Sequence, residues 1–508
     1  MSPVVVAFVV CMLVACYRIM RIGSRERGVA HGPGTIPILG NLHQVPTTFP
    51  HLRFTEWARE YGEIYSLKFG SGTVIVLSSA RAIKEVLDIQ SMDTSDRPPN
   101  LYFDMVTDGW GIFLCRYSNK WRQLRKAAQT LLASSTVKKY IPIQEAEATQ
   151  LQFDMLLAPE NFFDHVYRFS ASVILSVTYG KRAPRSETPT AKAFAEINSR
   201  WSEFIAPRGT PPTDLQPLLR WIPDRLDPWA SESGFFMANV IRDRPSHELT
   251  EEQMSMLAGS LYEAGSHTTA TYLHGLVLLL ATHPDVQAKA FAELDDVVGE
   301  TRSPTYEDTE GLPYLRALLQ EAHRFRVLEP LSIPHRATRD LHYKGHLIPE
   351  GATLFGNIHL FDAPEEFNPD RYLLTPHGTR PGVEDGDLRS TLVFGIGRRI
   401  CPGMHLASAS TILAAMKFIW AFQFSPAVDP ATGKEVPLDP RAACDGLAVG
   451  VPRFACDIRC RSPAKAQIVR RTFQVDAAPT LSAFEYNLAK ADKDWLDSVR
   501  VLPEEVMC

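Results

Sequence analysis

The chain has little excess of charge of either sign. Its 53 Lys and Arg residues stand against 58 Asp and Glu residues in 508, which gives a formal net charge of −5. Nucleic-acid-binding proteins usually carry a basic excess or a charged tail, and neither is present here. The sequence therefore gives no indication of a nucleic-acid partner.

Cysteine is scarce, with eight residues at irregular spacing. A disulfide framework needs more cysteines at regular intervals in a shorter chain, so none is expected. Cys456 and Cys460 lie four residues apart, but no second Cys or His pair at ligand spacing accompanies them, which argues against a zinc site. The chain also lacks internal repeats and long low-complexity tracts. A reduced globular protein that faces the cytosol is the simplest interpretation.

The N-terminus lacks charge, since residues 1–17 contain no charged side chain and four arginines follow at positions 18, 21, 25 and 27. A membrane-spanning helix needs about 20 apolar residues, which the run reaches if the arginines snorkel. A cleaved secretory signal would place its positive charge before the apolar core. We therefore expect residues 1–22 to form a single-pass transmembrane anchor with the globular part on the cytosolic side.

Two further segments follow the expected anchor. Residues 23–45 are basic and contain Pro and Gly, which predicts a stiff hinge between membrane and globule. Residues 46–508 form one large domain with a C-terminal tail, and 45% hydrophobic residues suffice for its core.

Helical periodicity dominates this domain. Helices are predicted at 51–61, 79–88, 119–132, within 140–180, and at 190–205, 249–281, 312–325 and 405–422. The segments 64–69 and 73–77 read as two strands of a hairpin around Gly70-Ser71-Gly72, and further short strands follow up to about residue 357. The predicted fold class is mainly α with a small β lobe.

One loop is built to present a single sulfur atom. It reads Phe394-Gly395-Ile396-Gly397-Arg398-Arg399-Ile400-Cys401-Pro402-Gly403. The glycines allow close approach of the backbone to a flat group, and Pro402 fixes the turn. Arg399 can pair with an anion beside a thiolate. Haem meets both needs, with iron for the sulfur and two propionates for the cations. Taken alone, the loop also fits an ordinary buried Cys in a Gly-rich turn.

The loop resembles the cysteine-ligand loop of the haem-thiolate monooxygenases, the cytochrome P-450 family. That pattern is Phe, two variable residues, Gly, one variable, Arg, one variable, Cys, one variable, Gly, and every fixed position is met. The resemblance implies a cytochrome P-450 fold, haem b as cofactor and Cys401 as the ligand of its iron. Phe394, Gly395, Arg399 and Gly403 would then belong to the cofactor site.

Three more residues match family positions that contact haem propionates. Trp121 and Arg125 are four residues apart on one helix face, and their N–H groups are good donors for a carboxylate. A solvated basic helix is the alternative, since Lys120 and Lys126 are adjacent. His335 matches a third propionate contact.

Glu321 and Arg324 share a helix face and could form a surface ion pair of little consequence. In the family, an Arg matching Arg371 joins such a pair in a structural network. We therefore expect these three residues to form one buried network with no catalytic role.

The run Ala264-Gly265-Ser266-His267-Thr268-Thr269 lies in the middle of a predicted helix, where Gly and Thr are costly. It suggests a local widening of the helix. In the family this is the oxygen-activation site, and Thr268 matches its Thr. His267 stands where an acid is usual. A His can relay protons near neutral pH, or it can point away, and the sequence leaves both roles open.

The resemblance is greatest to fungal microsomal members, many of which act on secondary metabolites. It implies oxidation of a small apolar substrate with dioxygen and electrons from an NADPH-cytochrome P-450 reductase, at the endoplasmic reticulum membrane. His267 also permits a haem-thiolate isomerase or dehydratase that uses no dioxygen. A connection at 355–364 that is shorter than in the family permits an inactive haem-binding member. Substrate contacts are expected around 100–115 and 201–215.

Overall fold

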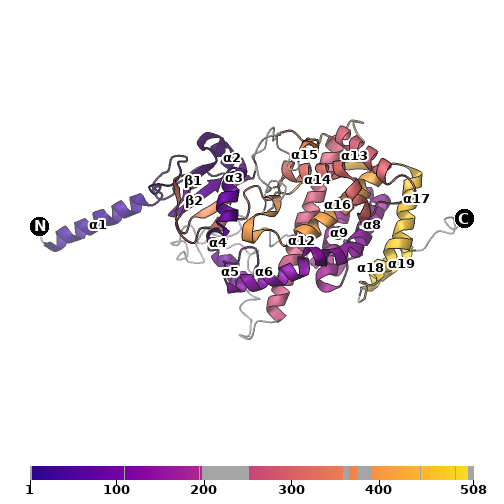
Figure 1. Cartoon of the computed structure of the whole chain (residues 1–508), viewed down its shortest axis with the longest axis horizontal. Coiled ribbons are helices and arrows are strands. Elements are labelled where there is room, and N and C mark those ends of the chain that lie inside the picture. Colours follow the sequence, from indigo (N-terminus) through magenta and orange to yellow (C-terminus); the bar gives the residue numbers. More distant parts are fainter. Residues whose placement is uncertain are drawn as a thin grey trace.

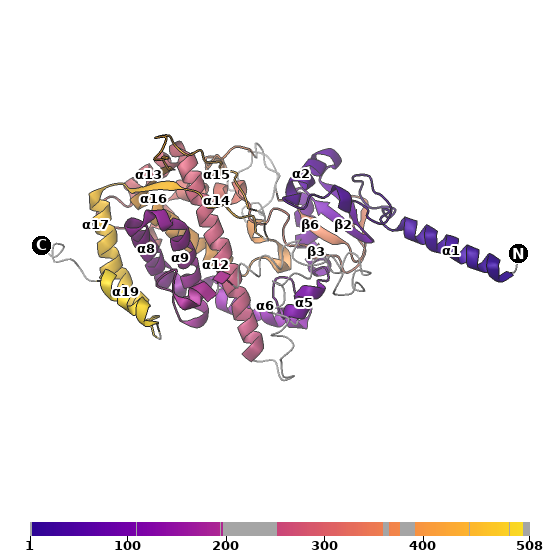
Figure 2. The same cartoon turned by 180° about the vertical axis from the view of Figure 1, so that it is seen from behind.

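The computed structural model of the chain describes residues 3–107, 109–193, 195–196, 251–358, 365–375, 392–444, 446, 448–486 and 488–500. The molecule is elongated, with the N-terminal helix at one end and the C-terminal helices at the other (Figure 1). A projecting helix, a small β lobe, a large helical body and a layer of C-terminal helices follow one another along the long axis (Figures 1 and 2). The mainly α fold with a small β lobe is thereby confirmed.

The helical body contains the elements that surround the candidate site. They are α5 (Leu101–Thr107), α6 (Asn119–Leu132), α7 (Ser134–Val137), α8 (Ile141–Leu157), α9 (Phe162–Tyr179), α12 (Glu251–Thr282), α13 (Pro284–Val297), α14 (Pro313–Phe325), α15 (Arg371–Leu374) and α16 (Met404–Ala421). α16 is apolar on almost every side because it lies in the core, between α8, α12 and α13. α12 packs along α9, and at Gly265 a Cβ atom would lie 3.1 Å from Ile174 of α9, so glycine permits this close approach.

The β lobe contains the N-terminal helices α2 (Pro50–Tyr61), α3 (Ala80–Ile83) and α4 (Ser91–Thr94). Its main sheet has the strand order β1-β2-β6-β3, made by Ile64–Phe69, Gly72–Leu77, Thr353–Gly356 and His335–Arg336. β1 and β2 form the predicted antiparallel hairpin, with Ile64 opposite Leu77. β2 pairs in parallel with β6, which brings the segment after α14 against the N-terminal sheet.

Two small sheets and the tail complete the structure. β4 (Leu341–Tyr343) pairs with β5 (His346–Ile348), and β7 (Phe422–Pro426) pairs with β8 (Cys456–Cys460). The tail helices α17 (Pro463–Arg471), α18 (Ala478–Ser482) and α19 (Lys490–Arg500) cover the end of the body farthest from α1 (Figure 1).

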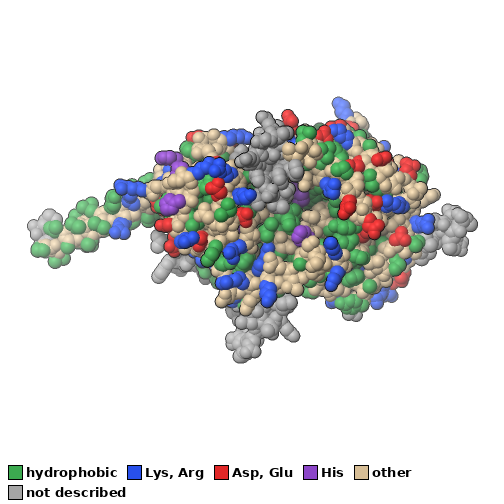
Figure 3. All heavy atoms as spheres, in the orientation of Figure 1, with side chains coloured by type: hydrophobic (Ala, Val, Ile, Leu, Met, Phe, Trp, Pro, Cys, Tyr) green, Lys and Arg blue, Asp and Glu red, His purple; other side chains and the backbone are tan. Residues whose placement is uncertain are grey.

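Two described helices are long and apolar enough to cross a membrane, and they differ in burial. α16 is a core helix, 72% buried over its most apolar window. α1 (Pro3–Arg21) has a mean hydropathy of 2.3 and none of it is buried. Figure 3 shows α1 as a projection covered by hydrophobic side chains, with Lys and Arg near the globular body. An apolar helix with this exposure suits a membrane anchor.

Most predicted helices agree with the structure within one or two residues, but three expectations need comment. The segment 140–180 is two helices, because a 3₁₀ turn at Pro159–Asn161 separates α8 from α9. The expected widening in α12 is wrong, since the helix is continuously α-helical from Glu251 to Thr282. Most of the predicted helix at 190–205 lies outside the described residues.

Candidate functional site

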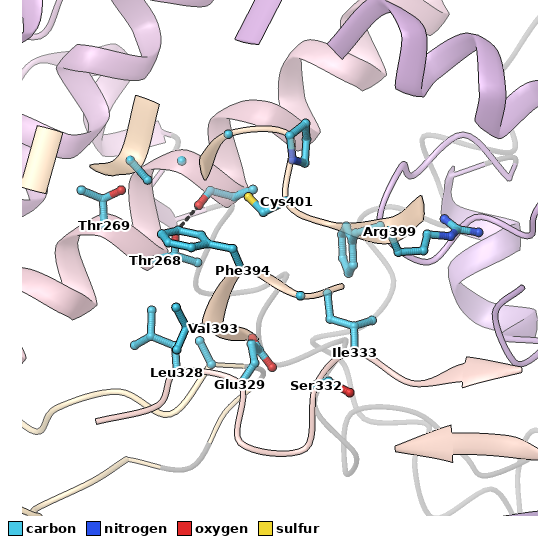
Figure 4. A pocket seen from close by; sticks show the side chains of 18 of the residues that line it. Thr268, Thr269, Leu328, Glu329, Ser332, Ile333, Val393, Phe394, Arg399 and Cys401 are labelled. Carbon is cyan, nitrogen blue, oxygen red and sulfur yellow. Dashed lines mark hydrogen bonds between the residues drawn. The ribbon is translucent and has the colours of Figure 1, made fainter. Parts of the chain in front are cut away.

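A central cavity of about 340 Å³ lies between α6, α9, α12, the Cys401 loop and the segment that joins α14 to β6. Its walls are largely apolar, and the Cys401 sulfur lies on one side of it. Figure 4 shows the Cys401 loop facing Thr268 and Thr269 of α12, with the segment from Leu328 to Ile333 as a third wall. The structure thus brings the predicted loop and the predicted α12 site together around one space.

The Cys401 loop owes its shape to glycine and to the start of α16. Gly395 and Gly397 have φ of 81° and 60°, a conformation that disfavours other residues. The Cys401 amide donates to the carbonyl of Phe394 at 2.7 Å, which closes the loop. Burial raises the pKa of the Cys401 thiol, while the amides of Gly403 and Met404 and the charge of Arg125 oppose that rise. These groups favour a thiolate once a cation binds the sulfur.

Three arginines of the described residues border the same cavity: Arg97 and Arg125 are buried, and Arg399 is partly buried. Arg97 donates to the carbonyls of Phe113, Ile333 and Pro334 at 2.7–2.9 Å. Arg125 donates to Ile400 at 2.5 Å, and Arg399 donates to Ser95 and Cys115 at 2.8 and 2.7 Å.

Among the described residues, no carboxylate forms an ion pair with any of these three arginines. Burial lowers the pKa of all three groups, to about 10 for Arg399. Arg97 and Arg399 also repel each other, which contributes to the low pKa of Arg97. Buried cations without counter-charge are costly, and a bound anion would remove that cost.

Trp121 and His335 both line the cavity. Trp121 is 5% exposed, and the guanidinium of Arg399 stacks 4.2 Å above its ring. His335 Nδ1 lies 2.7 Å from the Thr94 carbonyl, so that nitrogen carries a hydrogen. Burial, reinforced by Arg97, lowers the pKa of His335 well below its usual value. In this neutral tautomer Nε2 has no hydrogen to donate. It could donate to a carboxylate only after the ring takes up a second proton, which the negative charge of that carboxylate would favour.

On α12, Thr268 and His267 both line the cavity. The Thr268 hydroxyl donates to the Ala264 carbonyl at 2.6 Å, so its lone pairs remain available as acceptors. Burial lowers the pKa of His267. His267 therefore belongs to the cavity wall in its neutral form.

The expected structural network is confirmed. Glu321 is fully buried and pairs with Arg324 at 2.7 Å and with Arg371 at 3.1 Å. It also accepts the Asn368 amide at 2.7 Å. These contacts tie α14 to the segment around α15 and do not reach the cavity.

Among the cavity residues that sequence reasoning missed, two are charged residues in loops: Arg97 and Glu329. Arg97 lies in Asp96-Arg97-Pro98-Pro99, where a basic residue in a Pro-rich loop resembles any surface turn. Glu329 lies in the segment after α14, where no pattern in the adjacent sequence indicates that its side chain lines a cavity. Of the expected substrate segments, Ile112 and Phe113 line the cavity, whereas 201–215 lies outside the described residues, as do 359–364 of the short connection.

A family model described as "Cytochrome P-450" matches residues 30–233 and 227–439. The chain belongs to the cytochrome P-450 family. A cytochrome P-450 monooxygenase of Armillaria gallica is 36% identical over 516 residues, covering 95% of this chain and 99% of that protein. A second, from Arthrobotrys oligospora, is 36% identical over 90% of this chain and 94% of its own length. A third, macC of Penicillium terrestre, is 34% identical over 92% and 95%. Like these relatives, the chain is a monooxygenase.

The family implies a haem cofactor, and the cavity residues of this cytochrome P-450 fit one. Haem needs a sulfur ligand for its iron and cations for two carboxylates. The cavity offers one thiol, Cys401, beside amides and a guanidinium that favour its anion. It also offers the guanidiniums of Arg97, Arg125 and Arg399, which pair with no carboxylate in the part of the chain that the structure describes. The apolar walls suit the flat macrocycle.

Proposed function

We propose that this protein is a membrane-anchored haem-thiolate monooxygenase that binds haem b and oxidises a small apolar substrate. One observation carries the proposal: a cysteine sulfur faces an apolar cavity bordered by three guanidiniums, and none of them pairs with a carboxylate of the described residues. When bound, the haem supplies the oxidising chemistry, which uses dioxygen to insert one oxygen atom into a substrate.

The chain's own residues would hold and orient that cofactor. Cys401 provides the sulfur ligand, and Phe394, Gly395 and Gly403 shape the loop around it. Arg97, Arg125, Arg399 and Trp121 donate to the propionates, and His335 does so once protonated. The apolar walls exclude water and bind the substrate.

Thr268 and His267 are proposed to move protons at the opposite wall. The Thr268 hydroxyl can accept a hydrogen bond while it donates to Ala264, so it can pass a proton only by exchanging that bond. Burial lowers the pKa of His267, so its ring is neutral near pH 7. In that form the ring can accept a proton at this wall of the cavity and pass it on.

The proposed cellular setting follows from α1. Residues 1–22 would anchor the protein in the endoplasmic reticulum membrane, residues 23–45 would form the hinge, and 46–508 would lie in the cytosol. Electrons would come from an NADPH-cytochrome P-450 reductase on the same membrane. The similarity to fungal monooxygenases favours a role in secondary-metabolite biosynthesis.

The test is the substitution Cys401→Ala in the full-length protein. It should abolish the thiolate-type spectrum of the reduced carbonyl complex and all oxidation. Cys444→Ala is the control, because Cys444 is an exposed free thiol. A Cys401→Ala protein that keeps the thiolate spectrum contradicts the assignment.

His267 is the observation that favours a second function, an isomerase or dehydratase that consumes no dioxygen. The two functions differ in one measurement. Substrate turnover without consumption of NADPH and dioxygen would establish the second and reject the first.

A further inference from the structure

The segment Leu328–Ser332 carries an acidic side chain into an otherwise apolar part of the central cavity. Glu329 lines the cavity together with Leu328, Ile333 and Val393. Figure 4 shows its carboxyl group between Leu328 and Ile333, below Val393. An acidic residue destabilises the folded protein at such a position, since burying a polar group costs free energy unless the group is hydrogen-bonded.

The backbone holds Glu329 in this position. The Leu328 carbonyl accepts the Val449 amide at 2.8 Å, and the Pro330 carbonyl accepts the Ile358 amide at 3.1 Å. Ser332 adopts a φ of 56°, which is rare for a residue with a side chain, and its hydroxyl accepts the Gly356 amide at 3.0 Å. These contacts fix the backbone on both sides of Glu329, and its side chain lines the cavity.

Within the described residues, no hydrogen bond or ion pair engages the Glu329 carboxyl group. Burial raises the pKa of Glu329 to about 8, and no neighbouring charge opposes the rise. Near pH 7 the group is therefore mainly the neutral acid. A neutral carboxyl offers one O–H donor and one carbonyl acceptor, so it complements a group that can both accept and donate.

We propose that Glu329 is the polar recognition point of the substrate site and binds a hydroxyl group on an otherwise apolar substrate. This inference rests on the proposed monooxygenase function. A hydroxyl both donates and accepts, so it satisfies the neutral carboxyl without burying a charge. An ammonium group would require two ions to be buried together, which at best offsets their desolvation. Glu329 would then fix which carbon of the substrate faces the cofactor.

Binding of matched probes to the full-length haem-loaded protein tests this. The probes are 4-propylphenol, its methyl ether, propylbenzene and 4-propylbenzylamine, with affinities measured by equilibrium dialysis and by the optical change of the haem. The phenol should bind about tenfold more tightly than the ether, because the ether leaves the carboxyl O–H or carbonyl without a partner. Glu329→Gln keeps a donor and an acceptor and should keep that preference. Glu329→Leu should remove it.

Leu328→Val is the matched control, because it changes packing beside Glu329 without changing polarity and should weaken all four probes alike. The thiolate-type carbonyl spectrum, which depends on Cys401, reports that each variant is folded and haem-loaded. Loss of that spectrum in the native protein would reject the proposed function itself.

Three results would overturn the inference while leaving that function intact. They are equal binding of phenol and ether by the native protein, a phenol preference that persists in Glu329→Leu, and tightest binding of the amine. Failure of the phenol to bind up to its solubility limit would also overturn it.

Discussion

Two groups of arginines inside this protein have different kinds of partner: backbone carbonyls in one group and carboxylates in the other. Around the central cavity, Arg97, Arg125 and Arg399 donate to backbone carbonyls and form no ion pair with a described carboxylate. Between α8, α9 and the tail, Arg168 and Arg182 are at most 2% exposed and both pair with Glu147, at 2.6 and 2.9 Å.

The tail completes the second group, since Arg182 also pairs with Glu485 at 2.6 Å. Burial alone would raise the pKa of Glu147, but Arg182 and Arg168 hold it below its ordinary value. A balanced cluster of this kind stabilises architecture. At the unbalanced group around the cavity, we propose that a ligand supplies the missing charge. The comparison therefore separates arginines paired within the architecture from arginines that we propose bind the cofactor, although the sequence presents both alike.

The largest effect should come from unbalancing the structural group. Glu147→Ala leaves Arg168 and Arg182 buried without their shared carboxylate, and should cost about 3–5 kcal/mol of unfolding free energy. Glu56→Ala is the control, because its pair with Arg53 is exposed at the surface and should be worth less than about 1 kcal/mol. Denaturant titration of both variants measures the difference. Equal losses of unfolding free energy in the two variants would contradict the assignment of Glu147 to a structural cluster.

Removing a cavity arginine should have a different signature. In Arg125→Ala the unfolding free energy of the haem-free protein should stay level or rise, because a buried unpaired cation disappears. Haem should dissociate about 10- to 100-fold faster, since a charge-assisted hydrogen bond is worth about 1.5–3 kcal/mol. Transfer of haem to excess apomyoglobin gives the rate. Destabilised apoprotein with unchanged haem loss would place Arg125 in the structural group.

Substitutions on α12 should change the reaction. They should leave unchanged both the unfolding free energy and the rate of haem loss, which depend on the two groups of arginines. In Thr268→Ala, NADPH consumption should release peroxide in place of product. Burial lowers the folded-state pKa of His267, so the neutral ring predominates at pH 7 and protonates as pH falls toward that value. Product per NADPH should therefore depend on pH below about 6.5 in the native enzyme and lose that dependence in His267→Ala.

His267→Asp extends this series, since it restores the acid that is usual at this position. If the native, Asp and Ala curves coincide, His267 is a bystander. A higher yield for the Asp variant would show that His267 reduces oxygen-activating efficiency.

The smallest effect should come from the other end of the molecule. Deleting residues 1–22 removes α1, which is exposed throughout, so haem content and unfolding free energy should not change. The protein should move from the membrane to the soluble fraction. Retention on membranes after a carbonate wash would reveal another attachment.

Sequence reasoning was most successful where local pattern decides the structure. The Cys401 loop, the β1–β2 hairpin and α6 follow from glycine, alternation and helical spacing over a few residues. Glu321, Arg324 and Arg371 were grouped by family resemblance, and the structure confirms their contact.

The sequence did not reveal interactions that depend on distant packing. Arg182 links Glu147 to Glu485, which lie far apart in the chain. No pattern in the sequence around either glutamate indicates this pairing. Arg97 and Glu329 look like ordinary loop residues until the fold encloses them. The expected widening of α12 was wrong: the Thr268 hydroxyl does donate to the Ala264 carbonyl, but the helix continues unbroken.

The central claim is that the cavity arginines pair with no carboxylate of the described residues because the cofactor brings two. An experimental structure of the haem-loaded protein tests this most directly. It should show Cys401 sulfur bound to the iron and propionate oxygens within hydrogen-bonding distance of Arg97, Arg125 and Arg399. Propionates directed away from these guanidiniums, with the arginines paired instead to protein carboxylates, would contradict the account.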